Sequence, residues 1–418
     1  MERILRIFLS KLIKKGALNI ETASGQRYTV GDGSPPVADV KFCDRGAERG
    51  VVLNPALRFG ELFMDGRVKV TRGSIYDVIS VASRNLPSFN QFVWLRLLEK
   101  ARRAFRGLSQ RNHLSKARRN TAHHYDLDGG LYELFLDQDR QYSCAYFERE
   151  GASLDEAQLA KKRHIAAKLL VEPGNRVLDI GCGWGGMGLY LAEICDANVT
   201  GITLSREQLG VAMKRAVDRG LQGKAEFLLQ DYREIDKRFD RIVSVGMFEH
   251  VGIGYYDAFF QQMARLLDDK GVALLHTIGH EGQPSPTNAW VAKYIFPGGY
   301  VPSLSDMMPA IERSGLLVTD IEILRVHYAE TLRHWRERFL ARRAEAVAMY
   351  DERFCRMWEF YLAGCECTFR FEDTVVFQIQ IAKRIDSLPL TRDYIAVREA
   401  ELRRRDSAAP STGLRIAG

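Results

Sequence analysis

The sequence predicts an α/β protein with a mixed, mostly parallel sheet, preceded by a small α+β domain. Short apolar runs alternate with helical patterns from about residue 121 to 390, and one of these runs ends in a glycine-rich turn. Residues 1–90 instead mix short β-like runs with turn signals. The 418 residues, 46% hydrophobic and 27% charged, suffice for two or three packed domains.

The first domain shows β-like runs at 26–30 and 68–71, with turn signals such as Gly31-Asp32-Gly33. The predicted order along the chain is a small α+β domain at 1–90, a basic helical linker at 91–120, the larger α/β domain at 121–390, and a charged, flexible tail at 391–418.

Two basic amphipathic stretches carry part of the net charge of +7. Residues 3–15 alternate apolar and basic side chains, and residues 96–119 hold nine Lys or Arg against one acid, Glu99. Such stretches can lie on an anionic bilayer with their apolar face inserted. The alternative is a solvated helix face packed on its own domain. No apolar run is long enough to span a membrane.

The seven cysteines show neither paired CxxC spacing nor a dense framework, and no signal-peptide pattern precedes them. These observations predict reduced thiols in a cytoplasmic protein, peripherally associated with the inner face of the membrane. No Cys/His/Asp spacing indicates a metal site. The sequence leaves open whether the chain forms a homodimer.

The glycine-rich turn follows the apolar run at 176–180, with Asp179 two residues before Gly181 in the sequence DIGCGWGG. Gly181 and Gly183 allow a sharp backbone turn and the close approach of a ligand. Dinucleotide-binding folds use GxGxxG instead. The D-x-G-x-G form resembles the first motif of class I S-adenosylmethionine methyltransferases, which have a Rossmann-like fold.

Two further strands are expected to end beside this turn, at 198–205 and 226–232, because ligands of open α/β sheets bind at the carboxyl ends of strands. Most such methyltransferases end the second strand with an acid that binds the ribose, whereas this chain offers Thr203 and Gln208. The predicted S-adenosylmethionine-binding residues are Tyr142, Ser143, Asp179, Gly181, Gly183, Thr203, Leu204, Gln208, Asp231 and Tyr232.

Several ordered motifs together resemble the cyclopropane-fatty-acyl-phospholipid synthases and the mycolic acid cyclopropane synthases. They cover roughly residues 120–385 and comprise HYDL at 124–127, QYSCAYF at 141–147, SVGMFEHVG at 244–252, HTIG at 276–279, FPGGY at 296–300, YAETL at 328–332 and EFYLAGC at 359–365. FGELFMDG at 59–66 resembles the extra domain of the phospholipid-acting members. The resemblance implies methylene transfer to cis double bonds of unsaturated phospholipid acyl chains.

An alkene is a poor nucleophile, so such an enzyme must align it with the sulfonium methyl and exclude water. Methyl transfer leaves a carbocation, which aromatic faces can stabilise, and a base must then remove a proton for the ring to close. No lysine is spaced as that base. The resemblance implies a bound bicarbonate in this role, held by Cys144, Glu249, His276, Ile278 through its backbone, and Tyr328.

Each catalytic candidate also has an ordinary structural interpretation. Cys144 alone would be an inert buried thiol, His276 a core or loop histidine, and Tyr328 a core aromatic. Glu249 follows the apolar strand 242–245, where a carboxylate is costly unless it has a partner.

Two alternatives remain open. One is a methyl-branching enzyme or another lipid or small-molecule methyltransferase. The other is a nucleic-acid-binding protein that uses residues 96–119 on phosphates, which is disfavoured because the chain lacks any reader motif; we therefore expect no nucleic-acid partner.

Overall fold

The computed structural model describes residues 1–86, 129–282, 284 and 287–408. The chain divides into two compact units that interleave in sequence. One comprises residues 1–109, 285–297 and 329–374, and the other comprises residues 110–284, 298–328 and 375–418. The second unit holds every predicted site residue.

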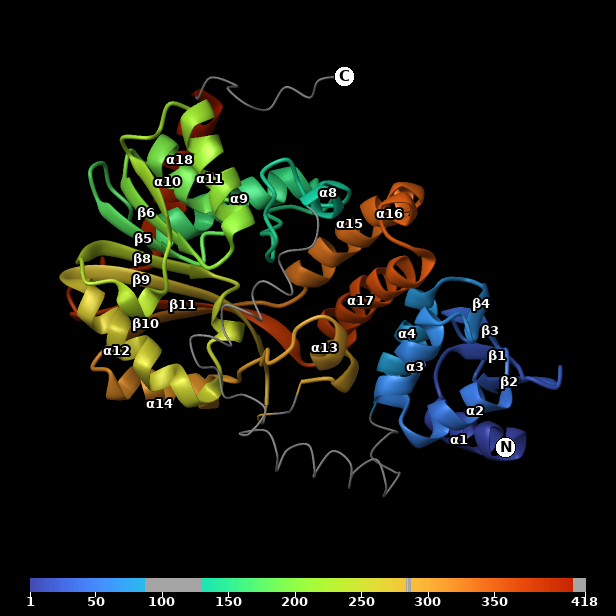
Figure 1. Ribbon diagram of the computed structural model, residues 1–418. Helices are drawn as coiled ribbons and strands as arrows, with labels where there is room; N and C mark the ends of the chain where they lie inside the picture. Colours follow the sequence, from blue (N-terminus) through green and yellow to red (C-terminus); the bar gives the residue numbers. More distant parts are fainter. Residues whose placement is uncertain (87–128, 283, 285–286, 409–418) are drawn as a thin grey trace. The chain divides into compact units, whose positions relative to one another are not determined.

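The second unit is built on a seven-stranded sheet with the strand order β10-β11-β9-β8-β5-β6-β7 (Figure 1). Neighbouring strands from β9 to β7 run parallel, while β10 and β11 are antiparallel. The mixed, mostly parallel sheet is therefore confirmed. The strands are β5 (Arg176–Ile180), β6 (Asn198–Thr203), β7 (Ala225–Leu229), β8 (Phe239–Val245), β9 (Leu267–His280), β10 (Leu317–Leu324) and β11 (Thr374–Ala382).

Helices cover both faces of this sheet (Figure 1). On one face lie α9 (Leu154–Lys168), α10 (Gly186–Ile194), α11 (Arg206–Asp218) and α18 (Asp393–Ala408). On the other lie α12 (Tyr256–Leu266) and α14 (Leu304–Arg313). Each layer has its own apolar core against the sheet, as expected for a three-layer α/β unit. The short elements are α8 (Gly129–Glu133) and the 3₁₀ turns η2 (Tyr232–Glu234), η3 (Phe248–His250) and η4 (Ile253–Tyr255).

Local sequence signals explain where the site-bearing helices begin. Ser153 and Glu156 form a capping box at the start of α9, so the first free N–H groups of that helix are bonded. Ser205 caps α11 by accepting a hydrogen bond from the Gln208 N–H. Gly185, at φ +82°, precedes α10 and ends the glycine-rich turn.

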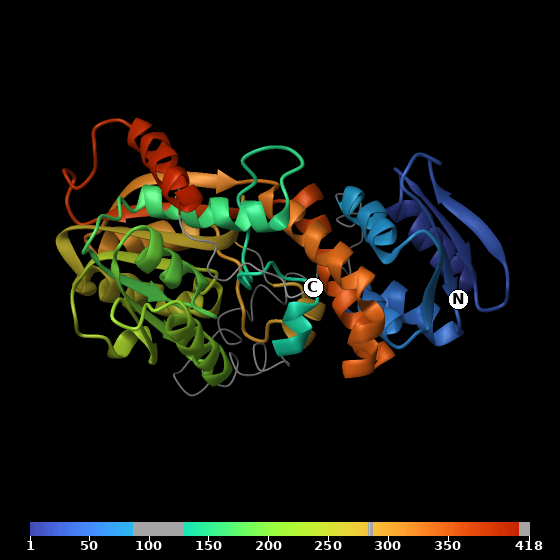
Figure 2. The ribbon, with the colours of Figure 1, turned by 90° about the horizontal axis from the view of Figure 1, so that it is seen from above.

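The C-terminal segment corrects a prediction. Residues 393–408, expected to belong to a flexible tail, form α18, which lies beside α9 (Figure 2). Ile395 and Leu402 are buried, and Arg163 donates to Asp406 at 2.6 Å. The charged composition of this segment indicated a tail, whereas Ile395 and Leu402, seven residues apart and so on the same helical face, were the signal for a packed helix.

The first unit contains a four-stranded sheet of order β2-β1-β3-β4, in which only the β1–β3 pair is parallel. The predicted α+β character of the N-terminal region is thus confirmed. Its elements are α1 (Glu2–Leu12), β1 (Ala17–Glu21), β2 (Arg27–Gly31), β3 (Val37–Phe42), α2 (Arg45–Leu53), α3 (Pro55–Met64), β4 (Val68–Arg72) and α4 (Ile75–Arg84). Later segments add α13 (Ala289–Tyr294), most of α15 (His327–Ala341), α16 (Arg343–Met349) and α17 (Glu352–Phe371).

The helix α1 shows how the first basic stretch is used. Its apolar side chains Leu5, Phe8 and Leu9 are buried in the core of this unit. That face is not available for insertion into a bilayer, and only Ile4 and Ile7 remain as exposed large apolar groups on the helix. The second stretch, 96–119, lies outside the described residues, as does HYDL at 124–127. No helix in the described ranges is long and apolar enough to cross a membrane.

Candidate active site

The glycine-rich turn is fixed to the neighbouring strand and opens on free space. The N–H groups of Gly181 and Cys182 donate to the Ile202 carbonyl at 2.9 and 3.0 Å. Gly181 has φ +81°, and a Cβ there would lie 2.8 Å from Met247 Cβ. Gly183 has φ +54°, and a Cβ there would meet no atom of the described residues within 4 Å. Glycine at 181 is therefore needed for packing, whereas glycine at 183 leaves a cradle that a ligand can approach.

The end of β6 carries a closed set of hydrogen bonds. Thr203 Oγ1 donates to Gln208 Oε1 at 2.9 Å, and Ser205 Oγ accepts from the Gln208 N–H at 3.3 Å. All three residues are buried, and Leu204 between them is half-buried. Thr203 and Gln208, bonded to each other, thus lie at the end of the second strand, where most class I methyltransferases have an acid.

At the end of β7, Asp231 is already bound within the chain. Its carboxylate caps η2 and accepts two hydrogen bonds from the Arg233 guanidinium, each at 2.7 Å. Tyr232 packs edge-on against Phe259 with ring centroids 5.2 Å apart, and burial raises the pKa of its phenol to about 12. A ligand at this strand end would meet a neutral Tyr232 and a paired Asp231.

Asp179 is buried in β5, and its Oδ2 atom has no hydrogen-bond partner within the described ranges. Burial raises the pKa of this carboxyl to about 7, although a hydrogen bond from the Gly188 N–H and the charge of Lys161 oppose the rise. A buried polar atom without a partner is costly. A ligand with a donor beside the cradle at Gly183 would remove that cost.

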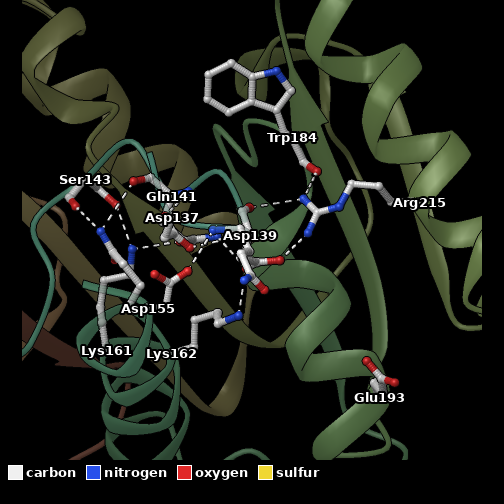
Figure 3. Close-up of polar contacts among 12 residues, drawn as sticks. Asp137, Asp139, Gln141, Ser143, Asp155, Lys161, Lys162, Trp184, Glu193 and Arg215 are labelled. Carbon is white, nitrogen blue, oxygen red and sulfur yellow. Dashed lines mark hydrogen bonds and ion pairs between the residues drawn. The ribbon is translucent and has the colours of Figure 1, made fainter. Parts of the chain in front are cut away.

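A salt-bridge cluster ties the segment before Cys144 to the glycine-rich turn (Figure 3). Asp139 binds Lys162 at 2.7 Å and is also ion-paired with Arg215. The same Arg215 donates to the Trp184 carbonyl at 2.7 Å. The arginine therefore links the turn at 181–186 with the segment that carries Tyr142, Ser143 and Cys144.

Lys161, which the sequence analysis did not single out, contacts this segment. Its ammonium donates to Gln141 Oε1 at 2.7 Å and to Ser143 Oγ at 2.8 Å (Figure 3). The side chain is fully buried, and burial lowers its pKa to about 8. Cys144 is also buried, with Sγ donating to the Ala145 carbonyl at 3.3 Å. Nothing in the run of basic residues at 161–163 distinguishes Lys161 as the fully buried member.

Glu249 and Ile278 are in direct contact. Glu249 Oε1 accepts a hydrogen bond from the Ile278 N–H at 2.6 Å. Its second oxygen, Oε2, is buried and has no partner within the described ranges. Burial raises the pKa of this carboxyl to about 7, against the hydrogen bonds that it accepts. Near neutral pH, Glu249 can therefore either donate or accept a hydrogen bond at Oε2.

His276 lies within β9 and does not end it, because the strand continues to His280. The Gly246 N–H donates to the His276 carbonyl at 2.9 Å, so His276 takes part in the sheet pairing. The imidazole is buried, with Nδ1 3.2 Å from Gln378 Nε2. Its Nε2 atom has no partner in the part of the chain that the structure describes. Burial holds the pKa of His276 well below its ordinary value, so the ring is neutral.

Tyr328 stands in the first turn of α15 and is buried. The residue before it, His327, accepts a hydrogen bond from the Phe147 N–H at 3.0 Å and stacks on Tyr146 with ring centroids 5.0 Å apart. The residue that precedes Tyr328 is thus in contact with the QYSCAYF motif, far away in sequence. The roles assigned to these residues in catalysis stay predictions.

Gln378 is a further residue that the sequence analysis missed. It lies in the apolar run Val375–Ile381, where a buried amide is costly without partners. Gln378 and Gln380 are the two polar positions of this run, and they were the available signal. Among the described residues, no group of His, Cys, Asp and Glu side chains is arranged to hold a metal ion.

Comparison with known proteins is consistent with this geometry. Residues 112–379 match the family model described as mycolic acid cyclopropane synthetase. A cyclopropane-fatty-acyl-phospholipid synthase of Escherichia coli K12 is 43% identical over 264 residues, which cover 63% of this chain and 68% of that protein.

Solved structures give the same result. The cyclopropane synthase MmaA2 from Mycobacterium tuberculosis is 35% identical, with a TM-score of 0.62 over 65% of this chain and 100% of that one. The mycolic acid cyclopropane synthase CmaA1, complexed with SAH and CTAB, is 37% identical, with a TM-score of 0.60 over 63% of this chain and 97% of that one. The chain belongs to the mycolic acid cyclopropane synthetase family and is an enzyme of the S-adenosylmethionine-dependent methyltransferase class.

Proposed function

We propose that this enzyme converts cis double bonds of unsaturated phospholipid acyl chains into cyclopropane rings, with S-adenosylmethionine as the donor and bicarbonate as the proton acceptor. Family membership and the similarity to a cyclopropane-fatty-acyl-phospholipid synthase support the reaction. The observation that carries the proposal is a pair of buried atoms without a partner in the described ranges, Glu249 Oε2 and His276 Nε2. Glu249 lies in η3, directly after β8, and His276 lies in the neighbouring strand β9.

The residues present fit both small molecules. The cradle at Gly183 and the unpartnered Asp179 Oδ2 suit a ligand with an extended backbone-like portion and an amino group. A neutral His276 and a Glu249 carboxyl that titrates near neutrality suit a small oxyanion, because each can offer a hydrogen-bond donor. When bound, S-adenosylmethionine supplies an electrophilic methyl group, and bicarbonate can accept a proton.

The chain's own contribution to such a reaction is to position the alkene and the methyl donor and to exclude water. The Arg215 and Lys161 contacts hold the segment at 139–144 beside the glycine-rich turn, which would keep the alkene and the methyl donor in line. The surroundings of Glu249 and His276 are buried, and a dry site strengthens every hydrogen bond to an anion there. The positive charge of Lys161 acts to lower the pKa of both His276 and Asp179.

Lipid analysis tests the reaction. Purified enzyme, incubated with vesicles of an unsaturated phospholipid and S-adenosylmethionine, should yield acyl chains heavier by one CH₂ that have lost their alkene protons in NMR spectra. A mass gain with an alkene retained in the product would indicate methyl branching and contradict the ring. Rigorously degassed buffer should slow the reaction, and added bicarbonate should restore it; an unchanged rate would contradict the role of bicarbonate.

The phospholipid substrate and the membrane surface as a partner form a separate part of the proposal. The basic stretch 96–119 supplies the charge argument, since each near-surface Lys or Arg contributes on the order of 1 kcal/mol on anionic lipid. The burial of the apolar face of α1 leaves this second stretch as the better candidate for docking. Salt should weaken binding to anionic vesicles.

A further inference from the structure

Gln378 connects Lys168 to His276 through its side-chain amide, whose oxygen and nitrogen each have a hydrogen-bond partner. It lies in β11, next to β9 in the sheet, and none of its surface is exposed. Its Oε1 atom accepts a hydrogen bond from Lys168 Nζ at 2.9 Å, and its Nε2 atom is 3.2 Å from His276 Nδ1. Both ends of the amide therefore have a partner.

Lys168 determines which way this amide faces. An ammonium can only donate hydrogen bonds, so the Gln378 atom that faces it must be the carbonyl oxygen. Lys168 is itself fully buried, which lowers its pKa, and its ion pair with Glu322 opposes that lowering and favours the charged ammonium. His164 also contacts Glu322, at 2.7 Å, so the carboxylate is held from two sides.

The direction of the amide in turn determines the tautomer of His276. With Oε1 occupied by Lys168, the Gln378 NH₂ group is the part that faces the ring, and an NH₂ group can only donate. His276 Nδ1 must then accept, and a neutral imidazole that accepts at Nδ1 carries its proton on Nε2. Nε2 is the atom left without a partner in the described part of the chain.

We propose that Lys168 and Gln378 are positioning residues that hold His276 in the Nε2–H tautomer, so that this N–H donates to the bicarbonate of the proposed reaction. The relay runs from Lys168 Nζ to Gln378 Oε1, and from Gln378 Nε2 to His276 Nδ1. Outer partners of a ligating histidine commonly fix its tautomer and ring orientation in this way. The second half of this inference, donation to bicarbonate, rests on the proposed function.

The tautomer can be measured directly. In protein labelled with ¹⁵N-histidine, one of nine histidines, identified by its loss in His276→Gln, should show a pyrrole-type Nε2 and a pyridine-type Nδ1. In Gln378→Met, which removes the amide but keeps a side chain of similar volume, both tautomers should appear. The bicarbonate concentration for half-maximal rate should rise by about two- to tenfold, the worth of one net hydrogen bond.

Gln380→Met is the matched control. Gln380 lies two residues along the same strand, is 2% exposed and donates to the Lys168 carbonyl at 2.6 Å, but its contacts are with Lys168, Thr319 and Tyr394. It should lose a similar amount of stability and leave both the His276 signals and the bicarbonate dependence as in wild type.

Four results would contradict the inference or the function on which its second half rests. A wild-type His276 protonated at Nδ1, or a single unchanged tautomer in Gln378→Met, would refute the relay. A mixed tautomer in Gln378→Met with an unchanged bicarbonate dependence would refute donation to the anion. A wild-type rate independent of bicarbonate would refute the proposed function itself, and the wild-type tautomer would show whether the relay stands.

Discussion

The two halves of the candidate site differ in how their buried polar groups are satisfied. At the ends of β6 and β7, Thr203 is bonded to Gln208 and Asp231 to Arg233, while the space beside Gly183 stays open. After β8 and within β9, Glu249 Oε2 and His276 Nε2 are buried without a partner in the described ranges. The first half suits a large ligand that approaches the backbone, and the second suits a small, strongly hydrogen-bonded one.

Glu249→Gln should produce the largest effect and tests whether the halves are separate. The amide keeps the shape of the carboxyl but cannot exchange its proton, and one placed donor or acceptor at a reacting centre is worth about 100- to 1,000-fold in kcat. The rate of cyclopropane formation should therefore fall by that factor. Binding of S-adenosylmethionine, measured by calorimetry, should stay within a few-fold of wild type. A large loss of cofactor affinity would mean that the two halves act as one.

The pH dependence of stability should sharpen the comparison. Burial raises the pKa of Glu249 from 4.5 to about 7, so the folded state holds a proton that the unfolded state has released between these values. The protonated form stabilises the fold below pH 4.5, and this contribution is lost as pH rises through 7. Relative to wild type, Glu249→Gln should therefore gain up to about 3 kcal/mol in free energy of unfolding between pH 4.5 and 8.

The same denaturant titrations on Asp179→Asn distinguish the halves, because the pKa of Asp179 is also raised to about 7. Asp179 should show a pH effect of the same sign, and added S-adenosylmethionine should change it, since that carboxyl belongs to the cradle. A difference between Glu249→Gln and wild type that does not vary with pH would contradict the burial of an uncompensated carboxyl in the second half.

The cradle was more accessible to sequence analysis than the second half, for physical reasons. Glycine spacing and strand ends are local properties, and β5 begins and ends where the pattern placed it. The predicted residues Thr203 and Asp231 do lie at strand ends, but their partners Gln208 and Arg233 could not be assigned as such from spacing alone.

The second half depends on contacts between residues distant in sequence. Lys161 touches Ser143, and Gln378 touches His276, across separations that no periodic pattern encodes. The resemblance supplied Glu249, His276 and Ile278, and the structure supplied the contact that joins two of them. A polar residue in an apolar strand, such as Gln378, is the kind of signal that marks a hidden partner before a structure is known.

Gly183→Val should produce the smallest of the three effects and tests the cradle by itself. A valine side chain would fill space that no atom of the described residues occupies and would reach where the ligand should lie. We expect the affinity for S-adenosylmethionine to fall by about 10- to 100-fold in calorimetry, because displacing a bound group from close backbone contact costs one or two hydrogen bonds. The kcat at saturating cofactor should change less than in Glu249→Gln.

The variant also carries backbone strain, since Gly183 has φ +54°, and a branched residue is disfavoured there. Gly220→Val separates strain from obstruction. Gly220 has φ +67°, and an added Cβ there would likewise meet no described residue within 4 Å, but Gly220 lies after α11, away from the turn that follows β5. Both variants should lose similar stability in denaturant titrations. If Gly220→Val weakened cofactor binding as much as Gly183→Val, the loss would come from strain transmitted through the unit, and the cradle at Gly183 would not be the place where the cofactor lies.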